Sequence, residues 1–214
     1  MKRNFHDTGL CMPHKHYMVD TSAKIEKIID LIEKGSYFIM NRPRQFGKTT
    51  TFFLLWKKLI ERKDLLVIKL SFEGIGDEIF ENSKTFSIGF IKMFNQELSR
   101  MYPNFPLFIK SDLISDENGI KFLSEQITDF SKNCGRKIIL MIDEVDKSTN
   151  NQLFLHFLGM LRDKYLKQEE GTDFSFLSVV LAGVHDVKTI KLKLRPDEEK
   201  KINSPWNIAV DFTI

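Results

Sequence analysis

The sequence predicts an α/β protein in which a largely parallel sheet lies between two layers of helices. Short apolar runs alternate along the chain with longer stretches in which apolar residues recur every three or four positions, as on one face of a helix. The short runs are nearly continuous, which is typical of strands covered on both faces. With 214 residues, 42% of them hydrophobic, the chain can bury one substantial core. Five strands alternating mostly with helices therefore predict a three-layer α/β/α sandwich.

The first half of the chain supplies two helices and two strands. Apolar residues at helical spacing predict a first helix that Gly35 ends, with a buried stripe of Ile25, Ile28, Ile29 and Ile32. The run 38–40 predicts the first strand, and the stretch from about Thr49 to Arg62 predicts the next helix. The apolar run 65–72 predicts the second strand.

The second half continues the alternation. Two further amphipathic helices are predicted by Phe86, Phe90, Phe94 and Leu98, and by Ile120, Leu123, Ile127 and Phe130. A buried strand is expected at 137–142, and a capping box at Thr149 and Gln152 opens another helix. The runs 176–182 and 208–212 predict the fourth and fifth strands.

Composition narrows the classes of function. The 32 Lys and Arg side chains nearly balance 29 Asp and Glu, so the net charge of +3 predicts no strong field for nucleic acid. Cys11 and Cys134 lack the spacing of a metal or disulfide site, which suits a reducing cytosol. Apolar runs are much shorter than the roughly 20 residues of a membrane helix. No apolar signal core follows Met1. We therefore expect a cytoplasmic protein without a membrane partner.

The loop after the first strand carries the main functional motif. It ends in Gly47-Lys48-Thr49, and a strand, a loop and a helix with this ending form the context of a P-loop, or Walker A motif. Backbone N–H groups and the helix N-terminus would bind phosphate, Lys48 would reach the terminal phosphates, and Thr49 would coordinate Mg²⁺. The full pattern has glycine where this chain has Arg42. A basic loop before an amphipathic helix is therefore the alternative.

A second motif follows the buried strand 137–142. That strand delivers Asp143 and Glu144 to the carboxyl edge of the sheet, where α/β folds bind ligands. There Asp143 can hold Mg²⁺ opposite Thr49, as a Walker B aspartate, and Glu144 can orient or deprotonate an attacking water. Taken alone, the two carboxylates could be a solvated strand end. Their order and distance from the P-loop, with one further strand between, suit ATPases with an added strand.

Several segments resemble the AAA-ATPase-like family. RPRQFGKT is similar to the GPRRxGKT P-loop of archaeal-type and STAND-like ATPases, with matches at Pro43, Arg44, Gly47, Lys48 and Thr49. Further resemblance lies in HYMVDTSAKIEKIIDLIEKGSYF, NRPRQFGKTT, IDEVDK, SVVLAGVHDVKTIK and NSPWNIA, which together cover nearly the whole chain. An arginine before the proline is usual in that family, so Arg42 looks like a family trait.

The resemblance implies an ATP-binding fold with a five-stranded sheet in the order 5-1-4-3-2, and ATP and Mg²⁺ as cofactors. Residues 1–20 would be an N-terminal extension in which Tyr17 stacks on adenine, and residues 21–214 the ATPase core. Longer family members carry a C-terminal nuclease-like domain of the PD-(D/E)XK type. Since the chain ends at Ile214, we expect it to lack that domain and an AAA lid. A homo-oligomer or a nuclease-like domain is the expected partner, and nucleic acid enters only by family analogy.

Other residues complete the predicted site. The expected nucleotide ligands are Pro43, Arg44, Gln45, Phe46, Gly47, Lys48, Thr49, Thr50 and Tyr17. Within this set Thr50 would lie near the α-phosphate, Phe46 would pack beneath the loop, and Arg44 would lie over the phosphates or face solvent. His185 and Arg195 are candidates for a γ-phosphate sensor and an arginine finger, with surface roles as alternatives.

We therefore expect Mg²⁺-dependent hydrolysis of ATP to ADP and phosphate. Lys48 and Glu144 would be catalytic, and Thr49 and Asp143 would hold the metal. The main alternative is a nucleotide-gated switch with negligible turnover that regulates a partner or nuclease domain. Glu144 favours hydrolysis, whereas the lack of a lid favours the switch. Two further candidates are a small-molecule kinase on the same fold and a basic interaction domain in which GKT occurs by chance.

Overall fold

A five-stranded sheet organises the computed structural model, which describes residues 4–5, 9–12, 14–41, 47–111, 118–145, 152–183 and 210–213. The strands are β1 (Phe38–Asn41), β2 (Leu65–Ser71), β3 (Lys137–Asp143), β4 (Ser178–Gly183) and β5 (Val210–Thr213). They lie in the order β2-β3-β4-β1-β5, and each neighbouring pair is parallel. Read from the other edge, this is the order 5-1-4-3-2 that the family resemblance implied.

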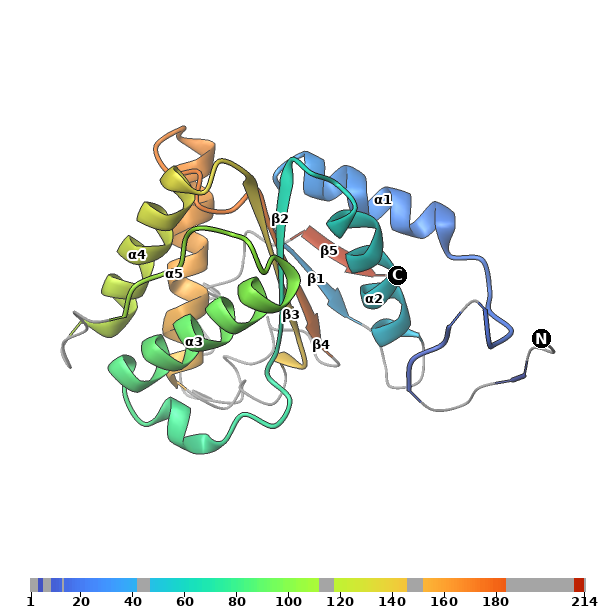
Figure 1. Cartoon of the computed structure of the whole chain (residues 1–214), viewed down its shortest axis with the longest axis horizontal. Helices are drawn as coiled ribbons and strands as arrows, with labels where there is room; N and C mark the ends of the chain where they lie inside the picture. The colour runs from blue at the N-terminus through green and yellow to red at the C-terminus, as the bar shows by residue number, and fades with distance from the viewer. Residues whose placement is uncertain are drawn as a thin grey trace, which may run out of the picture.

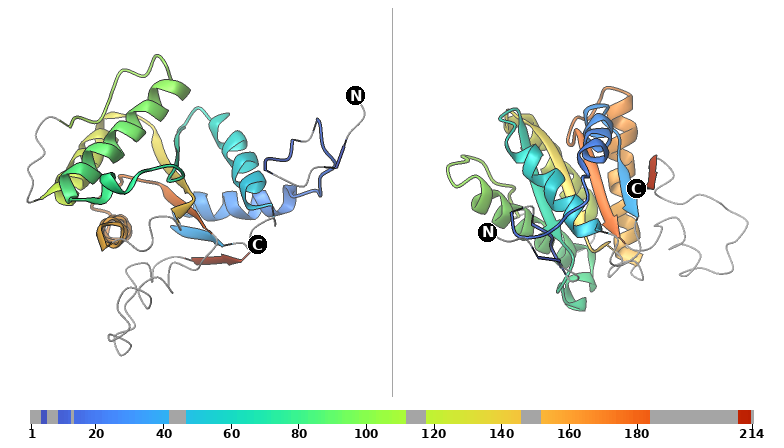
Figure 2. Two further views of the ribbon diagram at one scale, coloured as in Figure 1. Left: turned by 90° about the horizontal axis from the view of Figure 1, so that it is seen from below. Right: turned by 90° about the vertical axis from the view of Figure 1, so that its right-hand side faces the viewer.

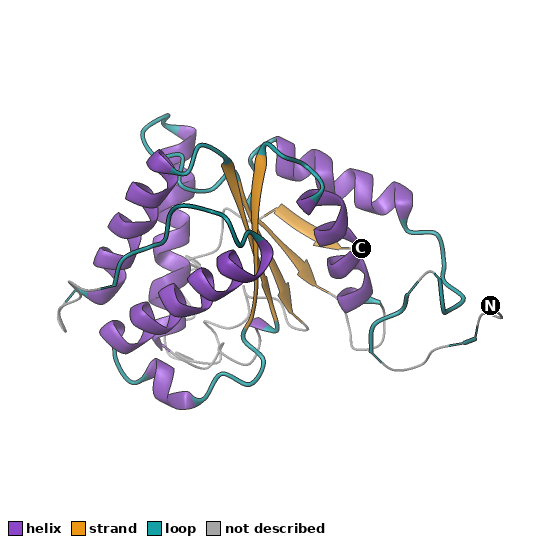
Figure 3. Ribbon diagram, in the orientation of Figure 1, coloured by secondary structure: helices purple, strands orange, loops and turns teal. Residues whose placement is uncertain are grey.

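Helices cover both faces of the sheet (Figures 1 and 3). They are α1 (Ser22–Glu33), α2 (Lys48–Ile60), α3 (Ser83–Met101), α4 (Gly119–Asn133) and α5 (Gln152–Glu169), with a 3₁₀ turn, η1, at Asp77–Phe80. The expected helices are confirmed, although α2 begins one residue before the predicted start and ends two residues before the predicted end. No helix in the described part of the chain is long and apolar enough to cross a membrane.

The alternation of side chains along the strands builds two cores. On β2, Leu66, Ile68 and Leu70 pack with α3, α4 and α5, whereas Leu65 and Val67 pack with α1 and α2. Because both faces are covered, nearly every residue of β3 and β4 is buried, as the apolar runs predicted. The three-layer architecture therefore follows from strands that are apolar on both sides.

The N-terminal segment lies apart from the layers, beyond the start of α2 (Figures 1 and 2).

Because all neighbouring strands are parallel, their carboxyl ends lie at one edge of the sheet and their amino ends at the other. The carboxyl ends of β1 and β3 meet at one edge, and α2 starts shortly after β1 at that edge. The start of α2 and the end of β3, which carry several of the predicted functional residues, are therefore brought to the same edge by the topology.

Candidate nucleotide-binding site

The start of α2 has the geometry of a phosphate-binding helix N-terminus. Gly47 is the N-cap residue and adopts φ 74°, a left-handed conformation that glycine reaches without a steric penalty. Its carbonyl accepts the first helical hydrogen bond from the Thr51 N–H at 2.8 Å. The first turn carries no acidic side chain, so the positive potential of this helix end is not neutralised from within the helix.

Lys48 joins α2 to the end of β3. Its Nζ lies 3.2 Å from Asp143 Oδ1 and 3.2 Å from Glu144 Oε1. The Lys48 and Asp143 side chains are 8% and 11% exposed, whereas the Glu144 side chain is 28% exposed. The two motifs, far apart in sequence, therefore meet at one point on the carboxyl edge.

Glu144 has an unusual backbone. Among the described residues it is the non-glycine residue with a positive φ, at 56°. Its N–H donates to Asp143 Oδ1 at 2.9 Å, which helps to hold this conformation. A left-handed conformation costs a residue with a side chain about 1–2 kcal/mol, and such strain is concentrated at functional sites. No pattern in the sequence indicated it.

The N-terminal segment contacts the start of α2. The Cys11 N–H donates to Thr50 Oγ1 at 3.1 Å, so Thr50 ties this segment to the predicted phosphate site. Backbone hydrogen bonds between Asn4 and the chain at residues 15–17 hold the segment together. The Tyr17 ring lies 5.0 Å from that of Phe5, and both side chains are exposed. Phe5 was missed in the sequence, since a single aromatic residue in an irregular segment gives no local signal.

Two histidines, His14 and His16, lie in the described part of the N-terminal segment. His14 is exposed, and the His16 ring accepts a hydrogen bond from the Met12 N–H at 3.0 Å through Nδ1. Across the described residues, no three or more His, Cys, Asp or Glu side chains are grouped to hold a metal ion. The His16 ring is thus used to fix a turn.

The remaining predicted site residues fall into two groups. Thr49 is exposed at the second position of α2, beside Lys48. Outside the described residues lie Arg42, Pro43, Arg44, Gln45, Phe46, His185 and Arg195, and also Thr149 of the predicted capping box.

The donor set at this edge fits magnesium. Mg²⁺ prefers hard oxygen ligands and is usually held by one or two carboxylates together with the phosphates of a substrate. Asp143 and Glu144 offer carboxylate oxygens, and Thr49 offers a hydroxyl from the adjacent helix end. The same edge thus combines hydrogen-bond donors that suit an anion with oxygen atoms that suit a metal ion.

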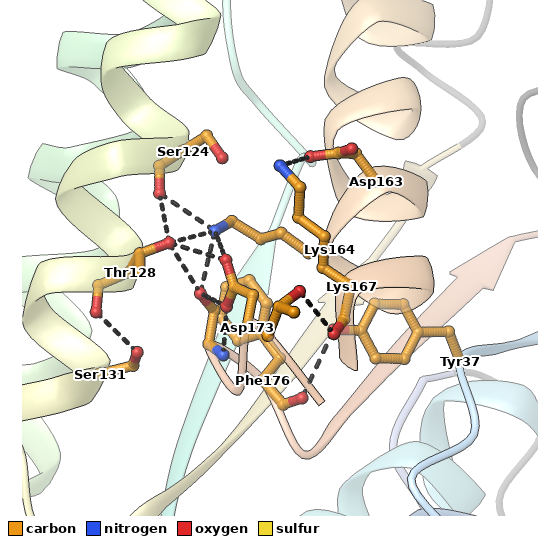
Figure 4. A network of polar contacts seen from close by, with 11 residues as sticks. Tyr37, Ser124, Thr128, Ser131, Asp163, Lys164, Lys167, Asp173 and Phe176 are labelled. Atoms are coloured by element: carbon orange, nitrogen blue, oxygen red, sulfur yellow. Dashed lines mark hydrogen bonds and ion pairs between the residues drawn. The ribbon is translucent and has the colours of Figure 1, made fainter. Parts of the chain in front are cut away.

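A second lysine–carboxylate cluster precedes β4 and so lies at the amino ends of the strands, opposite to the carboxyl edge. Figure 4 shows its polar contacts. Lys164, on α5, is 1% exposed. Its ammonium group donates to the Ser124 carbonyl at 3.0 Å, to Thr128 Oγ1 at 2.8 Å and to Ser175 Oγ at 2.9 Å. It also lies 3.2 Å from Asp173 Oδ2. This cluster joins α4, α5 and the segment before β4.

Burial and charge act in opposite directions in this second cluster. Burial lowers the pKa of Lys164, and the Asp173 carboxylate offsets this only in part. Burial also acts to raise the pKa of Asp173, but hydrogen bonds from Ser175 and Thr128 and the charge of Lys164 leave that pKa lowered. The ionised carboxylate is therefore part of the native structure.

Comparison with known proteins yields a family and a set of similar folds. A family model described as an AAA-like domain matches residues 11–209. None of the curated proteins matches the chain in sequence. The structure is similar to that of the Aeropyrum pernix ORC2 protein in ADPNP-ADP complexes, at 11% identity and a TM-score of 0.52, over 91% of this chain and 46% of that one. It is also similar to the Aeropyrum pernix ORC1 protein in complex with DNA, at 12% identity and a TM-score of 0.52, over 92% of this chain and 45% of that one.

The two similarities have different weight. At 11% and 12% identity, the likeness to the ORC proteins concerns the α/β fold alone. This chain spans less than half the length of either protein. The family match covers most of the chain and includes the start of α2 and the end of β3.

Proposed function

Because the chain belongs to the AAA-like domain family, we propose that it binds ATP with Mg²⁺ at the carboxyl edge of its sheet and hydrolyses it to ADP and phosphate. The observation that carries the proposal is the meeting of Lys48, at the N-terminus of α2, with Asp143 and Glu144, 3.2 Å away. An ammonium group, a helix N-terminus and two carboxylates at one sheet edge are the parts of a phosphoryl-transfer site.

Lys48 and the first turn of α2 would bind the phosphates. The ammonium group would neutralise the β- and γ-phosphates, while the backbone N–H groups after Gly47 donate to phosphate oxygens. Thr50 would lie near the α-phosphate, where its hydroxyl already contacts the N-terminal segment. We assign the loop residues Pro43, Arg44, Gln45 and Phe46 to the same phosphate-binding loop.

The metal ion and the attacking water would be held by Asp143, Thr49 and Glu144. Asp143 and Thr49 would hold Mg²⁺, which when bound neutralises charge on the β- and γ-phosphate oxygens. Glu144 would orient a water and accept its proton as the water oxygen bonds to the γ-phosphorus. The bond from that phosphorus to the β–γ bridging oxygen breaks, so that ADP and phosphate leave. Lys48 would stabilise the negative charge that develops on that bridging oxygen as ADP departs.

Tyr17 and Phe5 would bind the base. Their exposed rings form an aromatic pair on the segment that is tied to Thr50, one helical position beyond the proposed metal ligand. Aromatic stacking on a base is worth about 1–3 kcal/mol. Tyr17→Ala should therefore weaken ATP binding but leave binding of inorganic triphosphate unchanged, since triphosphate has no base. Equal losses for both ligands would exclude this role.

A nucleotide-gated switch with negligible turnover is the second candidate. It is favoured by the hydrogen bond from Lys48 to Glu144, because Glu144 would lose this partner if Lys48 turned to a phosphate. A switch of this kind would act on a partner or nuclease-like domain. Among the similar structures, DNA is bound by the ORC1 protein. A nucleic-acid partner for this chain rests on that likeness of fold alone.

Titration calorimetry with ATP, with and without Mg²⁺, tests the proposal. Wild type should bind ATP, and Lys48→Ala should bind at least about tenfold more weakly, since it removes charge-assisted hydrogen bonds to phosphate. The matched control is Lys63→Ala, because Lys63 is an exposed lysine beyond the opposite end of α2. Absence of ATP binding by wild type, or equal affinities for wild type and Lys48→Ala, would refute nucleotide binding at this site.

A further inference from the structure

We propose that Lys48 makes metal binding conditional on nucleotide. Without nucleotide, its ammonium group holds both carboxylates, Asp143 and Glu144, that would face the metal. Phosphate groups would draw Lys48 away and so release the two carboxylates. This inference rests on the proposed function and concerns the order in which the same site binds its ligands.

The contacts of Asp143 show why a metal ion would compete with Lys48 for this carboxylate. Its Oδ1 atom lies 3.2 Å from Lys48 Nζ and also accepts the Glu144 N–H at 2.9 Å. Two donors thus converge on one oxygen atom of the Asp143 carboxylate. Because Asp143 and Lys48 are nearly buried, their attraction is screened less than that of a surface pair. A metal ion would have to displace the ammonium group to reach this oxygen.

Glu144 is engaged by the same ammonium group. Its Oε1 accepts from Lys48 Nζ at 3.2 Å, so one cation bridges both carboxylates. The bridge reduces the local charge from two negative charges to one. Mg²⁺ gives up its water ligands reluctantly and is rarely held by protein groups alone. Two carboxylates shared with an ammonium group are therefore a poor metal site.

A polyphosphate changes this balance. Triphosphate carries several negative charges and meets the ammonium group beside the N-terminus of α2, which adds further attraction. Once Lys48 binds phosphate, Asp143 regains its full charge for the metal, and Glu144 becomes free to contact water. The exchange thus couples arrival of nucleotide to metal binding and to release of the proposed base.

Electron paramagnetic resonance with Mn²⁺ as the probe, on the full chain without nucleotide, tests this inference. Lys48→Met removes the charge but retains a chain of similar length, whereas Lys48→Arg retains the charge. We expect Lys48→Met to bind Mn²⁺ at least about tenfold more tightly than wild type, because a neighbouring positive charge is lost. Lys48→Arg should resemble wild type, and Lys48→Met/Asp143→Asn should lose the gain.

The inference is overturned if wild type binds Mn²⁺ without nucleotide as tightly as Lys48→Met does. It is also overturned if the gain persists in the double variant, because the metal would then lie elsewhere. If Lys48→Met does not fold, as judged by circular dichroism, wild type alone decides. It must bind Mn²⁺ only when ATP is present, and binding of Mn²⁺ without ATP contradicts the inference.

The two proposals can fail separately. Absence of ATP binding by wild type refutes the proposed function, whereas the effect of Lys48→Met on Mn²⁺ depends only on the ion pairs with Asp143 and Glu144. If wild type binds ATP but Lys48→Met gains no affinity for Mn²⁺, the nucleotide site stands and the conditional order is wrong.

Discussion

Two lysine–carboxylate clusters lie at opposite edges of one sheet, and they differ in what surrounds the ammonium group. Lys48 meets two carboxylates, Asp143 and Glu144, both at 3.2 Å and at the edge where the helix N-terminus is exposed. Lys164 meets one carboxylate, Asp173, together with a carbonyl and two hydroxyl groups at 2.8–3.0 Å. Lys48 thus has charged partners only among these contacts, whereas Lys164 has one charged partner and three neutral oxygen acceptors inside the protein.

The difference teaches that an ion pair alone does not indicate function. A buried lysine whose three protons all have fixed acceptors loses hydrogen bonds in any exchange, so its role is to hold elements together. A lysine shared by two carboxylates leaves a net negative charge beside it and lacks such a shell of neutral acceptors. Solvent access separates the clusters further, since the Glu144 side chain is 28% exposed and the Asp173 side chain is 10% exposed.

Among changes to the cluster of Lys48, Asp143 and Glu144, here called the edge cluster, Glu144→Gln is expected to have the largest effect, and that effect is on turnover. A glutamine keeps the shape of the side chain but cannot accept the proton of the attacking water, so turnover should fall about 10²–10⁴-fold with ATP affinity retained. Phosphate release under saturating ATP measures the rate, and Glu125→Gln, on the exposed side of α4, is the control. Unchanged, slow turnover in Glu144→Gln would favour the switch over hydrolysis.

In the buried cluster around Lys164, Lys164→Met should lower the stability of the fold and leave ATP binding at the carboxyl edge unchanged. Removing one member of a buried pair leaves the Asp173 carboxylate uncompensated, so the free energy of unfolding should fall by about 3–5 kcal/mol. Urea denaturation measures this loss, and Lys167→Met, which removes an exposed pair with Asp163, is the control.

The Lys164→Met/Asp173→Asn variant sharpens the test. Because it removes both charges, it should recover part of the lost stability. A loss in Lys164→Met no larger than in Lys167→Met would show that the buried cluster holds nothing together.

The sequence predicted the edge cluster because its two parts lie in separate local patterns. Parallel strands bring their carboxyl ends to one edge, so the start of α2, shortly after β1, and the two carboxylates at the end of β3 lie on the same side of the sheet. The near-continuous apolar runs also predicted the three layers, because strands that are apolar on both sides must be covered on both faces. The strand order, in contrast, came from family resemblance and not from the runs themselves.

The buried cluster could not be predicted in this way. Lys164 lies three residues after Leu161 on α5, and only its position on the buried stripe of that helix hints at burial. Its acceptors Thr128 and Ser175 come from α4 and from the segment before β4, which only tertiary packing brings together. The left-handed backbone of Glu144 was missed for a related reason, because non-glycine residues rarely adopt it and no residue type announces it.

The pH dependence of the free energy of unfolding tests whether Asp173, in the buried cluster, is ionised in the folded protein. The pKa of Asp173 in the folded protein is lowered, so its contribution is fully present above its unfolded pKa of about 3.9 and is lost as the pH falls through the folded value. Asp173→Asn should therefore cost about 1–3 kcal/mol near pH 6. The difference from wild type should shrink below about pH 4.

Urea denaturation at a series of pH values provides the measurement. Asp163→Asn, on the exposed surface of α5, is the control and should show little change across this range. A difference between wild type and Asp173→Asn that stays constant from neutral to acid pH would mean that the carboxylate is not ionised in the fold.

The backbone of Glu144 allows the smallest and sharpest comparison within the edge cluster. Glu144→Ala and Glu144→Gly both remove the side chain and its contact with Lys48, but only glycine relieves the positive φ of 56°. The glycine variant should be more stable than the alanine variant by about 1 kcal/mol, the cost of a left-handed conformation less the added entropy of an unfolded glycine. Thermal or urea denaturation of the two variants measures this difference. If alanine were the more stable, the left-handed turn would not persist without the glutamate, and the side chain itself would hold the strain in place.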